Sequence, residues 1–260
     1  MKKRPRVVVI TGGTRGLGRA LAEAFLGTGD HVWCLARGRA GRPPHGAHFI
    51  PTDILKASAV TDVTRRAKRA AKPTPAFPVD LATAAAEVRM RVGKIDIWIN
   101  NAGGGSPVPF ADPDDAAWRA VFDLNFHGVV NGCRAAVPML RGRGSVVINL
   151  ASLAGLMAPA GHSAYTSAKA AVIALTRSLA VEYAAAGIRF NAVAPGPLDT
   201  PGFRAAGGNP AARARSIPTR RLVRPAEVVS ACRWLCEPNA SVTGEVIVLD
   251  GAAAAAGCYA

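Results

Sequence analysis

The stretch SLAGLMAPAGHSAYTSAK, residues 152–169, places a tyrosine and a lysine four residues apart at the start of a helix pattern. Residues four apart share one face of a helix, so Tyr165 and Lys169 should point into the same space. A free phenol has a pKa of about 10, and a nearby ammonium lowers it because the positive charge favours the phenolate. Such a pair can act as a general acid or base. The same spacing also occurs on solvated helix faces, so other parts of the chain must distinguish the two interpretations.

The composition is that of one globular domain. Half of the 260 residues are apolar, and this length allows a single substantial core. No apolar run approaches the roughly 18 residues of a membrane span, and the short apolar run after the basic start indicates no signal peptide. Apart from one close pair, the five cysteines are scattered, and no histidine lies at metal-ligand spacing from them. This pattern predicts buried thiols and no metal site. We therefore expect a reduced, cytoplasmic protein.

The net charge of +15 has two interpretations. Arginine spread over a solvated surface explains most of it, and the alternative is attraction to an acidic partner or to nucleic acid. Residues 56–79 form a basic insertion that is broken by prolines. Its clustered cations are Arg65, Arg66, Lys68, Arg69 and Lys72. We favour a solvated helix face for this cluster over a binding patch.

A glycine-rich loop follows the first predicted strand, residues 6–11, and precedes a helix pattern. Glycine lets the backbone approach a phosphate, and a helix start offers N–H groups and the positive end of the helix dipole. In this context the loop predicts dinucleotide binding and not merely a tight turn. The loop residues expected at the cofactor are Gly12, Thr14, Arg15, Gly16, Leu17 and Gly18.

The second predicted strand, residues 31–36, ends at Ala36-Arg37 without a carboxylate. An acidic side chain at this point holds the adenosine 2′-hydroxyl, whereas a 2′-phosphate needs a cation. Arg37, together with Arg15 of the glycine loop, therefore favours NADP(H). Both could also be plain surface arginines, so the missing acid is the more informative observation.

The third predicted strand, residues 48–53, carries Asp53 and Ile54 at its carboxyl end. An alternative places the end of this strand at residues 77–81, around Asp80, although Asp80 could instead cap a helix that runs to residue 92. We favour Asp53, because the spacing from Asp80 to Asn100 leaves little room for a full helix.

Later predicted strands cover residues 95–100, 145–150, 188–193 and 246–249. Ser152 follows the fifth strand, where ligands bind in open α/β sheets. Asn125 lies inside a long helix predicted to begin at residue 112 or 113, where its side chain needs local partners. Residues 201–218 lack a clear period and predict a mobile substrate lid, and residues 225–236 predict a helix. The whole is an α/β chain: a single doubly wound Rossmann-type domain with about seven parallel strands and helices on both faces.

Together these motifs resemble the short-chain dehydrogenase/reductase family over nearly the whole chain. The resemblance rests on the glycine loop, Asn100-Asn101-Ala102-Gly103, Asn125, Ser152, Tyr165-x-x-x-Lys169 and Pro195-Gly196-x-x-x-Thr200. It implies that Tyr165 exchanges a proton with the substrate oxygen, that Ser152 hydrogen-bonds this oxygen, and that Lys169 lowers the tyrosine pKa and holds the nicotinamide ribose. It implies that Asn125 anchors a water chain. Further cofactor contacts implied by the resemblance are Asp53, Ile54, Asn100, Asn101, Ala102, Gly103, Pro195, Gly196, Leu198 and Thr200.

The resemblance predicts an NADPH-dependent ketoreductase similar to the 3-oxoacyl-carrier-protein reductase type, acting on a free or carrier-tethered carbonyl or alcohol. It also implies a homodimer or homotetramer. Expected substrate contacts are Ser152, Leu153, Met157, His162, Tyr165 and Phe203. Two alternatives are a basic protein that binds RNA or an acidic partner without turnover, and a cofactor-sensing regulator; four intact catalytic residues argue against both. The ending Asp250-Gly251-Ala252 departs from the family's usual Asp-Gly-Gly, which should affect packing of the tail and not the chemistry.

Overall fold

The computed structural model describes residues 4–38, 41–56, 78–105, 107–108, 110–111, 115–140, 142, 144–200, 203–204, 208–238 and 241–257. The basic cluster at residues 65–72 lies outside the described residues, as does most of the predicted insertion around it. Residues 201–202 and 205–207 of the predicted lid also lie outside them.

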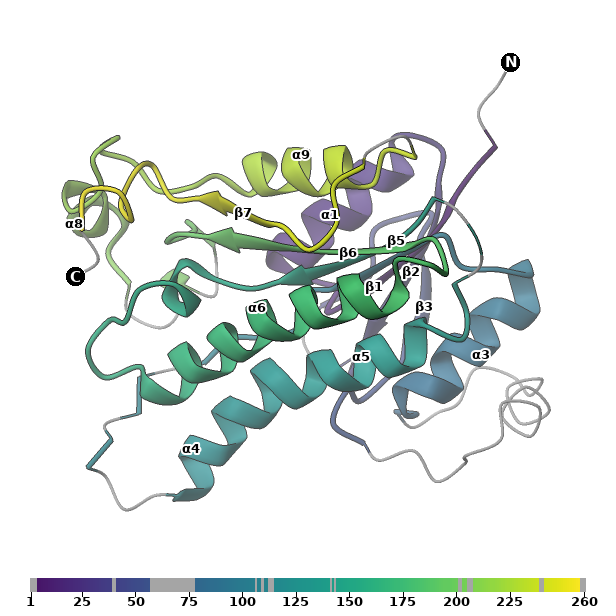
Figure 1. Ribbon diagram of the computed structural model, residues 1–260, viewed down its shortest axis with the longest axis horizontal. Coiled ribbons are helices and arrows are strands. Elements are labelled where there is room, and N and C mark those ends of the chain that lie inside the picture. Colours follow the sequence, from purple (N-terminus) through teal and green to yellow (C-terminus); the bar gives the residue numbers. More distant parts are fainter. Residues whose placement is uncertain are drawn as a thin grey trace.

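Seven parallel strands form one sheet in the order β3-β2-β1-β4-β5-β6-β7 (Figure 1). The strands are β1 (Val7–Thr11), β2 (His31–Ala36), β3 (His48–Pro51), β4 (Ile97–Asn100), β5 (Ser145–Leu150), β6 (Ile188–Pro195) and β7 (Val246–Leu249). The predicted Rossmann-type sheet of about seven strands is confirmed. The third strand is shorter than predicted, so Asp53 lies beyond its end and not within it.

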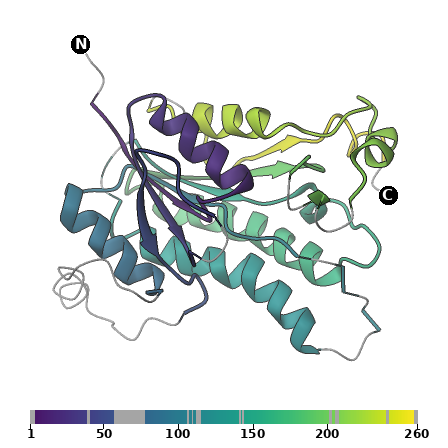
Figure 2. The same ribbon diagram turned by 180° about the vertical axis from the view of Figure 1, so that it is seen from behind.

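Helices cover both faces of the sheet, as predicted (Figures 1 and 2). On one face lie α1 (Gly16–Leu26) and α9 (Pro225–Leu235), and on the other lie α3 (Leu81–Val92), α5 (Gly128–Ala136) and α6 (Ser163–Tyr183). Side chains alternate along a strand, so β1 serves both layers. Val8 and Ile10 pack with α1 and α9, whereas Val7 and Val9 pack with the other helices. Burial on both sides explains why β1 is apolar almost throughout.

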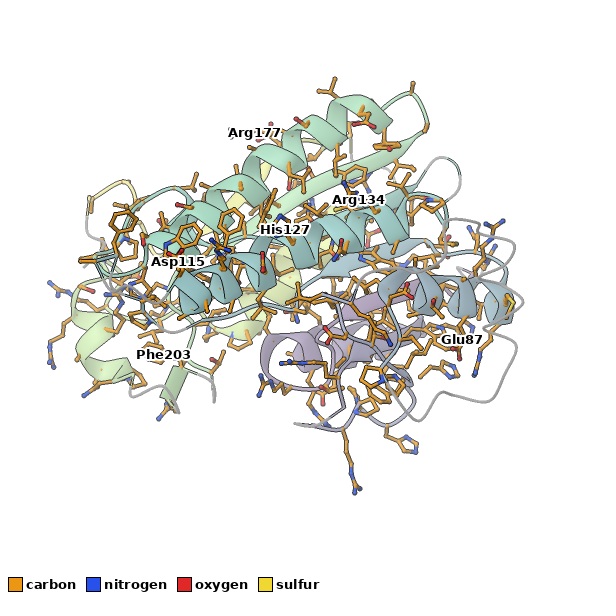
Figure 3. The ribbon with its side chains drawn as sticks, turned by 90° about the horizontal axis from the view of Figure 1, so that it is seen from below. Glu87, Asp115, His127, Arg134, Arg177 and Phe203 are labelled. Carbon is orange, nitrogen blue, oxygen red and sulfur yellow. The ribbon has the colours of Figure 1, made fainter. Side chains whose placement is uncertain are left out.

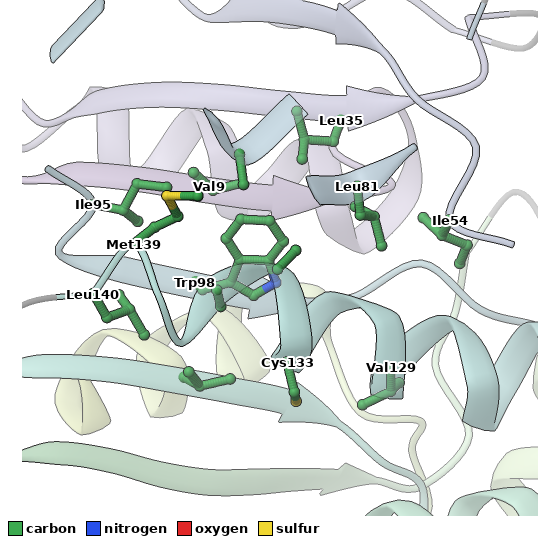
Figure 4. Packing of buried hydrophobic residues seen from close by; sticks show 14 of the residues in the cluster. Val9, Leu35, Ile54, Leu81, Ile95, Trp98, Val129, Cys133, Met139 and Leu140 are labelled. Carbon is green, nitrogen blue, oxygen red and sulfur yellow. The ribbon is translucent and has the colours of Figure 1, made fainter. Parts of the chain in front are cut away.

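Trp98 of β4 lies in the middle of the core cluster beneath α3, α5 and α6. Its side chain is fully buried, and Figure 4 shows the indole beside Val9 and Met139. A buried tryptophan removes a large apolar area from water, so it contributes strongly to this contact. Its packing holds β4 against α5, and both elements continue into the edge of the sheet where the site is expected.

The strand order reverses between β1 and β4, which are neighbours in the sheet but are separated by β2 and β3 in the chain. β1 continues into the glycine loop, and β4 continues into residues 101–103. Both loops therefore leave the carboxyl edge of the sheet at its topological switch point. Ligands of open α/β sheets bind at such a point.

Asp80 is the N-cap of α3. Its carboxylate accepts hydrogen bonds from the Thr83 N–H at 3.0 Å and from the Thr83 hydroxyl at 2.8 Å. The 12 residues of α3 fit between Asp80 and Asn100, so the argument that a full helix lacks room there is wrong. The cap occupies the Asp80 carboxylate, however, whereas the Asp53 carboxylate accepts only from the Leu55 N–H at 3.0 Å among the described residues. Asp53 thus stays the candidate for the adenosine side, for a different reason.

The two ends of the predicted insertion are hydrogen-bonded to each other beside β3. Thr52 and Val79 pair as a parallel bridge, and the Asp53 N–H donates to the Val79 carbonyl at 2.9 Å. The Lys56 Nζ donates to the Pro78 carbonyl, also at 2.9 Å. The chain therefore leaves and re-enters the fold at one place on the carboxyl edge of the sheet.

A short helix lies within the predicted lid, where the sequence showed no period. This helix, α8 (Pro210–Arg215), has Asn209 as its N-cap, and the Asn209 side chain accepts from the Ala212 N–H at 3.0 Å. An N-cap followed by proline is a helix-start signal that the sequence contains. Six residues are too few to reveal a helical period, which is why the helix was missed.

Candidate active site

Four glycines shape the loop between β1 and α1. Gly12 and Gly16 adopt φ angles of +69° and +51°, in the left-handed region that favours glycine. A Cβ at Gly13 would lie 2.6 Å from the Cys34 Sγ, and one at Gly18 would collide with the Gly12 carbonyl. Side chains are therefore excluded at Gly13, where the loop packs on β2, and at Gly18, where the first turn of α1 packs on the loop. This cradle fits the diphosphate of a dinucleotide, whose charge suits the helix dipole.

Thr11 joins the glycine loop to the loop that follows β4. Its Oγ1 accepts from the N–H groups of Asn101 and Ala102, each at 3.0 Å. The Asn101 Nδ2 donates in return to the Thr11 carbonyl at 2.9 Å. The two predicted cofactor loops consequently form one hydrogen-bonded rim at the switch point.

Arg15 and Arg37 follow the neighbouring strands β1 and β2, and both side chains are exposed. The loop after β2 folds back on the glycine loop at Gly41, where a Cβ would lie 2.7 Å from the Thr14 carbonyl. Within the described ranges, neither arginine forms an ion pair with an acidic side chain. Both guanidinium groups can therefore bind an anion at this edge.

Lys169 is buried on α6, with 3% of its surface exposed. Its Nζ donates to the Leu150 carbonyl at the end of β5, at 2.8 Å, and lies 5.7 Å from the centre of the Tyr165 ring. Burial lowers the pKa of this ammonium from 10.5 to about 8, because desolvation penalises the charged form. The predicted tyrosine and lysine therefore do share one space, and the Leu150 carbonyl is a site group that the sequence analysis missed.

Ser152 lies directly beyond β5 and is largely buried. Its Oγ accepts from the Ala154 N–H at 3.1 Å and caps the short 3₁₀ turn η2 (Leu153–Gly155). This turn packs tightly on α6, because a Cβ at Gly155 would lie 2.7 Å from the Lys169 carbonyl carbon. A glycine at this position thus lets Ser152 approach the helix that carries Tyr165 and Lys169.

Asn125 lies in a five-residue π-helical turn, η1 (Asp123–His127), between α4 (Asp115–Phe122) and α5. Its Nδ2 donates to the Val121 carbonyl at 2.8 Å and to the Gly104 carbonyl at 2.7 Å, while its Oδ1 accepts from the Gly104 N–H at 3.0 Å. The predicted need for local partners is confirmed, and the clamp on Gly104 was missed. Such π-turns are frequent at functional sites.

Gly103 lies between the Asn125 and Lys169 side chains. A Cβ there would lie 2.8 Å from the Asn125 Oδ1 and 3.4 Å from the Lys169 Nζ. A Cβ at Gly105 would lie 3.9 Å from the Tyr165 Cδ2, so the same loop also borders the tyrosine. The structure therefore brings Asn125, Ser152, Tyr165 and Lys169 together beside the cofactor rim.

The predicted nicotinamide turn follows β6. The Gly196 N–H donates to the Leu249 carbonyl at 2.8 Å, and the Thr200 Oγ1 accepts from the Phe203 N–H at 3.2 Å. Leu198 pairs with Val223 in a parallel bridge and is half-buried. The turn at Pro195-Gly196 thus leaves the same carboxyl edge of the sheet at which Ser152 lies.

The predicted substrate contacts are not equivalent. Leu153 is completely buried, so its side chain offers no surface to a substrate in this structure. Met157 and His162 are half-buried, and the His162 Nδ1 is within hydrogen-bond distance of the Ala160 carbonyl, at 2.9 Å. This contact lies within the turn that precedes α6, so it ties the His162 ring to its own backbone segment. Phe203 is half-buried beside the α8 segment (Figure 3).

Asn100 differs from its predicted role as a cofactor contact. Its side chain is 2% exposed and points into the core, where its Oδ1 accepts from the Trp98 Nε1 at 2.8 Å. The residue can act on the cofactor side only through the backbone that it leads into. The sequence of the Asn100-Asn101 motif does not show which of the two side-chain amides turns into the core.

Two other kinds of site have no candidate in the part of the chain that the structure describes. No group of three or more His, Cys, Asp or Glu side chains is placed to hold a metal ion. No helix of these residues is long and apolar enough to cross a membrane.

Comparisons with known proteins show the family of this chain. A family model described as Enoyl-(Acyl carrier protein) reductase matches residues 12–252. The 2-(R)-hydroxypropyl-CoM dehydrogenase of Xanthobacter autotrophicus is 35% identical over 95% of this chain and 98% of its own length. The cis-4-hydroxycyclohexanecarboxylate dehydrogenase of Sinomonas cyclohexanicum is 36% identical over 95% of each chain.

Solved structures give the same result. The aldohexose dehydrogenase of Thermoplasma acidophilum has a TM-score of 0.80 at 29% identity, covering 95% of this chain and 93% of its own. A short-chain dehydrogenase/reductase from Brucella melitensis, described as glucose/ribitol dehydrogenase, has a TM-score of 0.79 at 30% identity over 98% and 97% of the two chains. The chain belongs to the short-chain dehydrogenase/reductase family, whose members are oxidoreductases that use a nicotinamide cofactor.

Proposed function

We propose that this protein interconverts a secondary alcohol and a ketone, or reduces an aldehyde, with NADP(H). The observation that carries the proposal is the meeting of Asn125, Ser152, Tyr165 and Lys169 beside Gly103, next to a glycine cradle for a dinucleotide. A module that only binds RNA or an acidic partner has no use for this set of groups.

Each side chain has a separate task in the reduction. The nicotinamide, when bound, supplies the hydride, and Tyr165 gives its hydroxyl proton to the oxygen of the substrate carbonyl. Ser152 donates a hydrogen bond to the same oxygen, where negative charge develops. Oxidation of the alcohol runs through the same groups, with Tyr165 accepting the proton.

Lys169 and Asn125 support this proton transfer. The Lys169 ammonium has three donors, and the Leu150 carbonyl takes one of them. The remaining donors can hold the nicotinamide ribose and influence Tyr165. Asn125 fixes both backbone groups of Gly104, so it keeps the loop after β4 at a constant distance from Lys169. A water chain anchored at Asn125 would return protons from solvent.

The choice of NADP(H) over NAD(H) rests on the end of β2. Ala36-Arg37 offers no carboxylate to a 2′-hydroxyl, and Arg15 and Arg37 are both exposed and without an acidic partner in the described ranges. Two cations suit a 2′-phosphate. Asp53 and Ile54 are proposed on the adenine side, where Asp53 has a carboxylate that no helix cap occupies.

The test of the function is turnover. The purified protein is assayed with NADP⁺ and NAD⁺ on cyclohexanol, 2-butanol, cis-4-hydroxycyclohexanecarboxylate, a 3β-hydroxysteroid and a 3-hydroxyacyl thioester. We chose hydroxy compounds because two relatives are named as dehydrogenases of such substrates. Oxidation of any of them supports the proposal. No turnover with either cofactor, together with salt-sensitive retention of RNA, would favour the binding protein instead.

A carrier-tethered substrate is the second part of the proposal. The basic segment is joined to the fold at its two hydrogen-bonded ends, which include Thr52, Lys56 and Val79. These ends lie at the carboxyl edge of the sheet, as do the proposed catalytic residues. Positive charge on the basic segment would speed the approach of an acidic carrier. Charge reversal at Arg65, Arg66 and Arg69 should lower kcat/KM for a carrier-tethered ketone and not for a free one. Equal effects on both substrates would contradict it.

We also infer a homo-oligomer that pairs through α4, α5 and α6; α4 and α5 follow one another end to end, and α6 lies alongside them (Figures 1 and 3). Val129 of α5 and Ile173 of α6 pack into the chain's own core and cannot contribute. Val181 on α6 is 82% exposed, whereas Trp118 and Phe122 of α4, stacked at 5.4 Å between ring centres, are half-buried and leave part of their surface open. Exposed apolar surface of this kind favours association. A monomeric mass at micromolar concentration would contradict the inference.

A further inference from the structure

A continuous chain of buried polar side chains runs beneath the catalytic edge. The Trp98 Nε1 donates to the Asn100 Oδ1 at 2.8 Å, and the Asn100 Nδ2 donates to the Asn149 Oδ1 at 2.9 Å. The Asn149 Nδ2 donates to the Thr176 Oγ1 at 2.9 Å, and the Thr176 hydroxyl donates to the Val172 carbonyl at 2.7 Å. Trp98, Asn149 and Thr176 have no exposed surface, and Asn100 has 2%. Polar groups this deeply buried are costly unless they are satisfied, so the chain resists rearrangement.

Each of these hydrogen-bonded side chains lies on an element that carries part of the site. Asn100 ends β4, directly before the cofactor rim. Asn149 of β5 precedes Leu150, whose carbonyl holds the Lys169 Nζ, and lies three residues before Ser152. Thr176 lies two helical turns beyond Lys169 on α6. One set of hydrogen bonds therefore sets the spacing of β4, β5 and α6.

Helix α5, which follows Asn125, packs against the same hydrogen-bonded side chains. The Cys133 Sγ of α5 lies 3.5 Å from the Asn100 Nδ2 and 3.7 Å from the Asn149 Oδ1, and Figure 4 shows Cys133 close to Trp98. Gly132 has no room for a Cβ because the Asn100 side-chain amide occupies that place. All the elements that carry the catalytic residues thus meet at the Asn100–Asn149 pair.

We infer that Asn149 and Thr176 are positioning residues for the proton transfer, acting through Ser152 and Lys169; this rests on the proposed function. Packing by apolar side chains alone would tolerate several registers of α6 on β5. The Asn149–Thr176 bond selects one register, in which the Lys169 Nζ meets the Leu150 carbonyl and η2 seats Ser152 against α6. A slip of α6 would misplace both groups relative to the substrate oxygen, and small misplacements reduce turnover strongly.

The decisive variant is Thr176→Val, which removes the hydroxyl but keeps the side-chain shape. Its own backbone acceptor, the Val172 carbonyl, lies within the helix, so the main loss is the bond from Asn149. We expect kcat on the best alcohol of the panel to fall about 10- to 100-fold. The Kd for NADPH should stay within about twofold, because the glycine loop and its arginines are not touched. Thr176→Ser restores the hydroxyl and should recover most of kcat.

A matched control separates positioning from loss of stability. Val88→Ala opens a cavity in the same core cluster, under α3, which carries none of the proposed site residues, and should lower the melting temperature without changing kcat at 25 °C. The inference is overturned if Thr176→Val keeps wild-type kcat, or if its kcat falls only as far as that of Val88→Ala. Should Thr176→Val not fold, Thr176→Ala is judged by the same criteria.

Failure of the proposed function gives a different result. If the wild-type protein oxidises no alcohol of the panel, the proposed function fails, and the inference is then judged by amide hydrogen exchange in α6. Thr176→Val should speed exchange over residues 163–172 more than in α1, because the register of α6 is loosened. Equal exchange in the variant and the wild type would overturn the inference.

Discussion

Replacing Lys169 with methionine should stabilise the folded protein at neutral pH while it removes most of the activity. Burial lowers the pKa of the Lys169 ammonium from 10.5 to about 8. This difference corresponds to roughly 3 kcal/mol of folding free energy that the charged lysine costs below pH 8. Methionine has a similar length and no charge, and losing the hydrogen bond to the Leu150 carbonyl offsets about 1 kcal/mol of the gain. The variant should therefore be more stable by about 2 kcal/mol at pH 7.5.

The dependence on pH is the sharper part of this prediction. Between pH 8 and 10.5 the unfolded chain holds a proton on Lys169 that the folded chain has released, so the free energy of unfolding of the wild type rises with pH. This rise in the wild type's free energy of unfolding is complete above pH 10.5, where Lys169 is neutral in both states. It is lost as the pH falls through 8, where the buried lysine becomes charged. Buried thiols act in the opposite direction at higher pH, since burial raises the pKa of Cys34 and Cys133 to about 12. Only the difference between the two proteins isolates the lysine.

The assay is urea unfolding of the wild type and Lys169→Met from pH 7.5 to 10.5. The stability advantage of the variant should shrink by roughly 3 kcal/mol over this range. Lys56→Met, at an exposed lysine, is the matched control for the loss of a cation, and it should not reproduce the change expected of Lys169→Met. A constant difference for Lys169→Met would refute the reasoning, because it would mean that Lys169 is as well hydrated in the folded state as in the unfolded one.

Three further predictions concern the proton donor, the cofactor and the C-terminal turn. Tyr165→Phe removes the transferable proton and should lower kcat about 10²–10⁴-fold, measured against an unchanged Kd for NADPH; near wild-type turnover would exclude Tyr165 as the acid. Arg37→Ala should weaken NADPH binding by roughly 1.5–3 kcal/mol and leave NADH binding unchanged, as followed by fluorescence titration, and an unaltered preference would contradict the role of Arg37. Ala252 has a φ of +69°, where the family's usual glycine is unstrained, so Ala252→Gly should raise the free energy of unfolding by about 1 kcal/mol. Ala254→Gly in the same turn has no such strain to relieve and should not stabilise; an equal effect of the two substitutions would refute the strain argument.

Local patterns in the sequence predicted the elements well. Apolar runs placed the seven strands within two residues, since a strand buried on both faces must be apolar along its whole length. The four-residue spacing of Tyr165 and Lys169 placed them on one face of α6, because helix geometry is set by the backbone alone. The cap at Asp80 was also predictable, because a capping side chain bonds to a backbone group only three residues away.

Contacts between distant segments were decided only by the tertiary structure. Nothing in the sequence shows that Asn100 turns inward while Asn101 turns to the rim, or that Asn149 meets Thr176, 27 residues further along the chain. The burial of Leu153 and the acceptor that Leu150 offers to Lys169 are likewise results of packing. A sequence period reports which face of an element is apolar, but it carries no information on which other element covers that face. The candidate catalytic residues could be picked out from their spacing, whereas the distances between them depend on how β4, β5, α5 and α6 pack around one buried pair of amides.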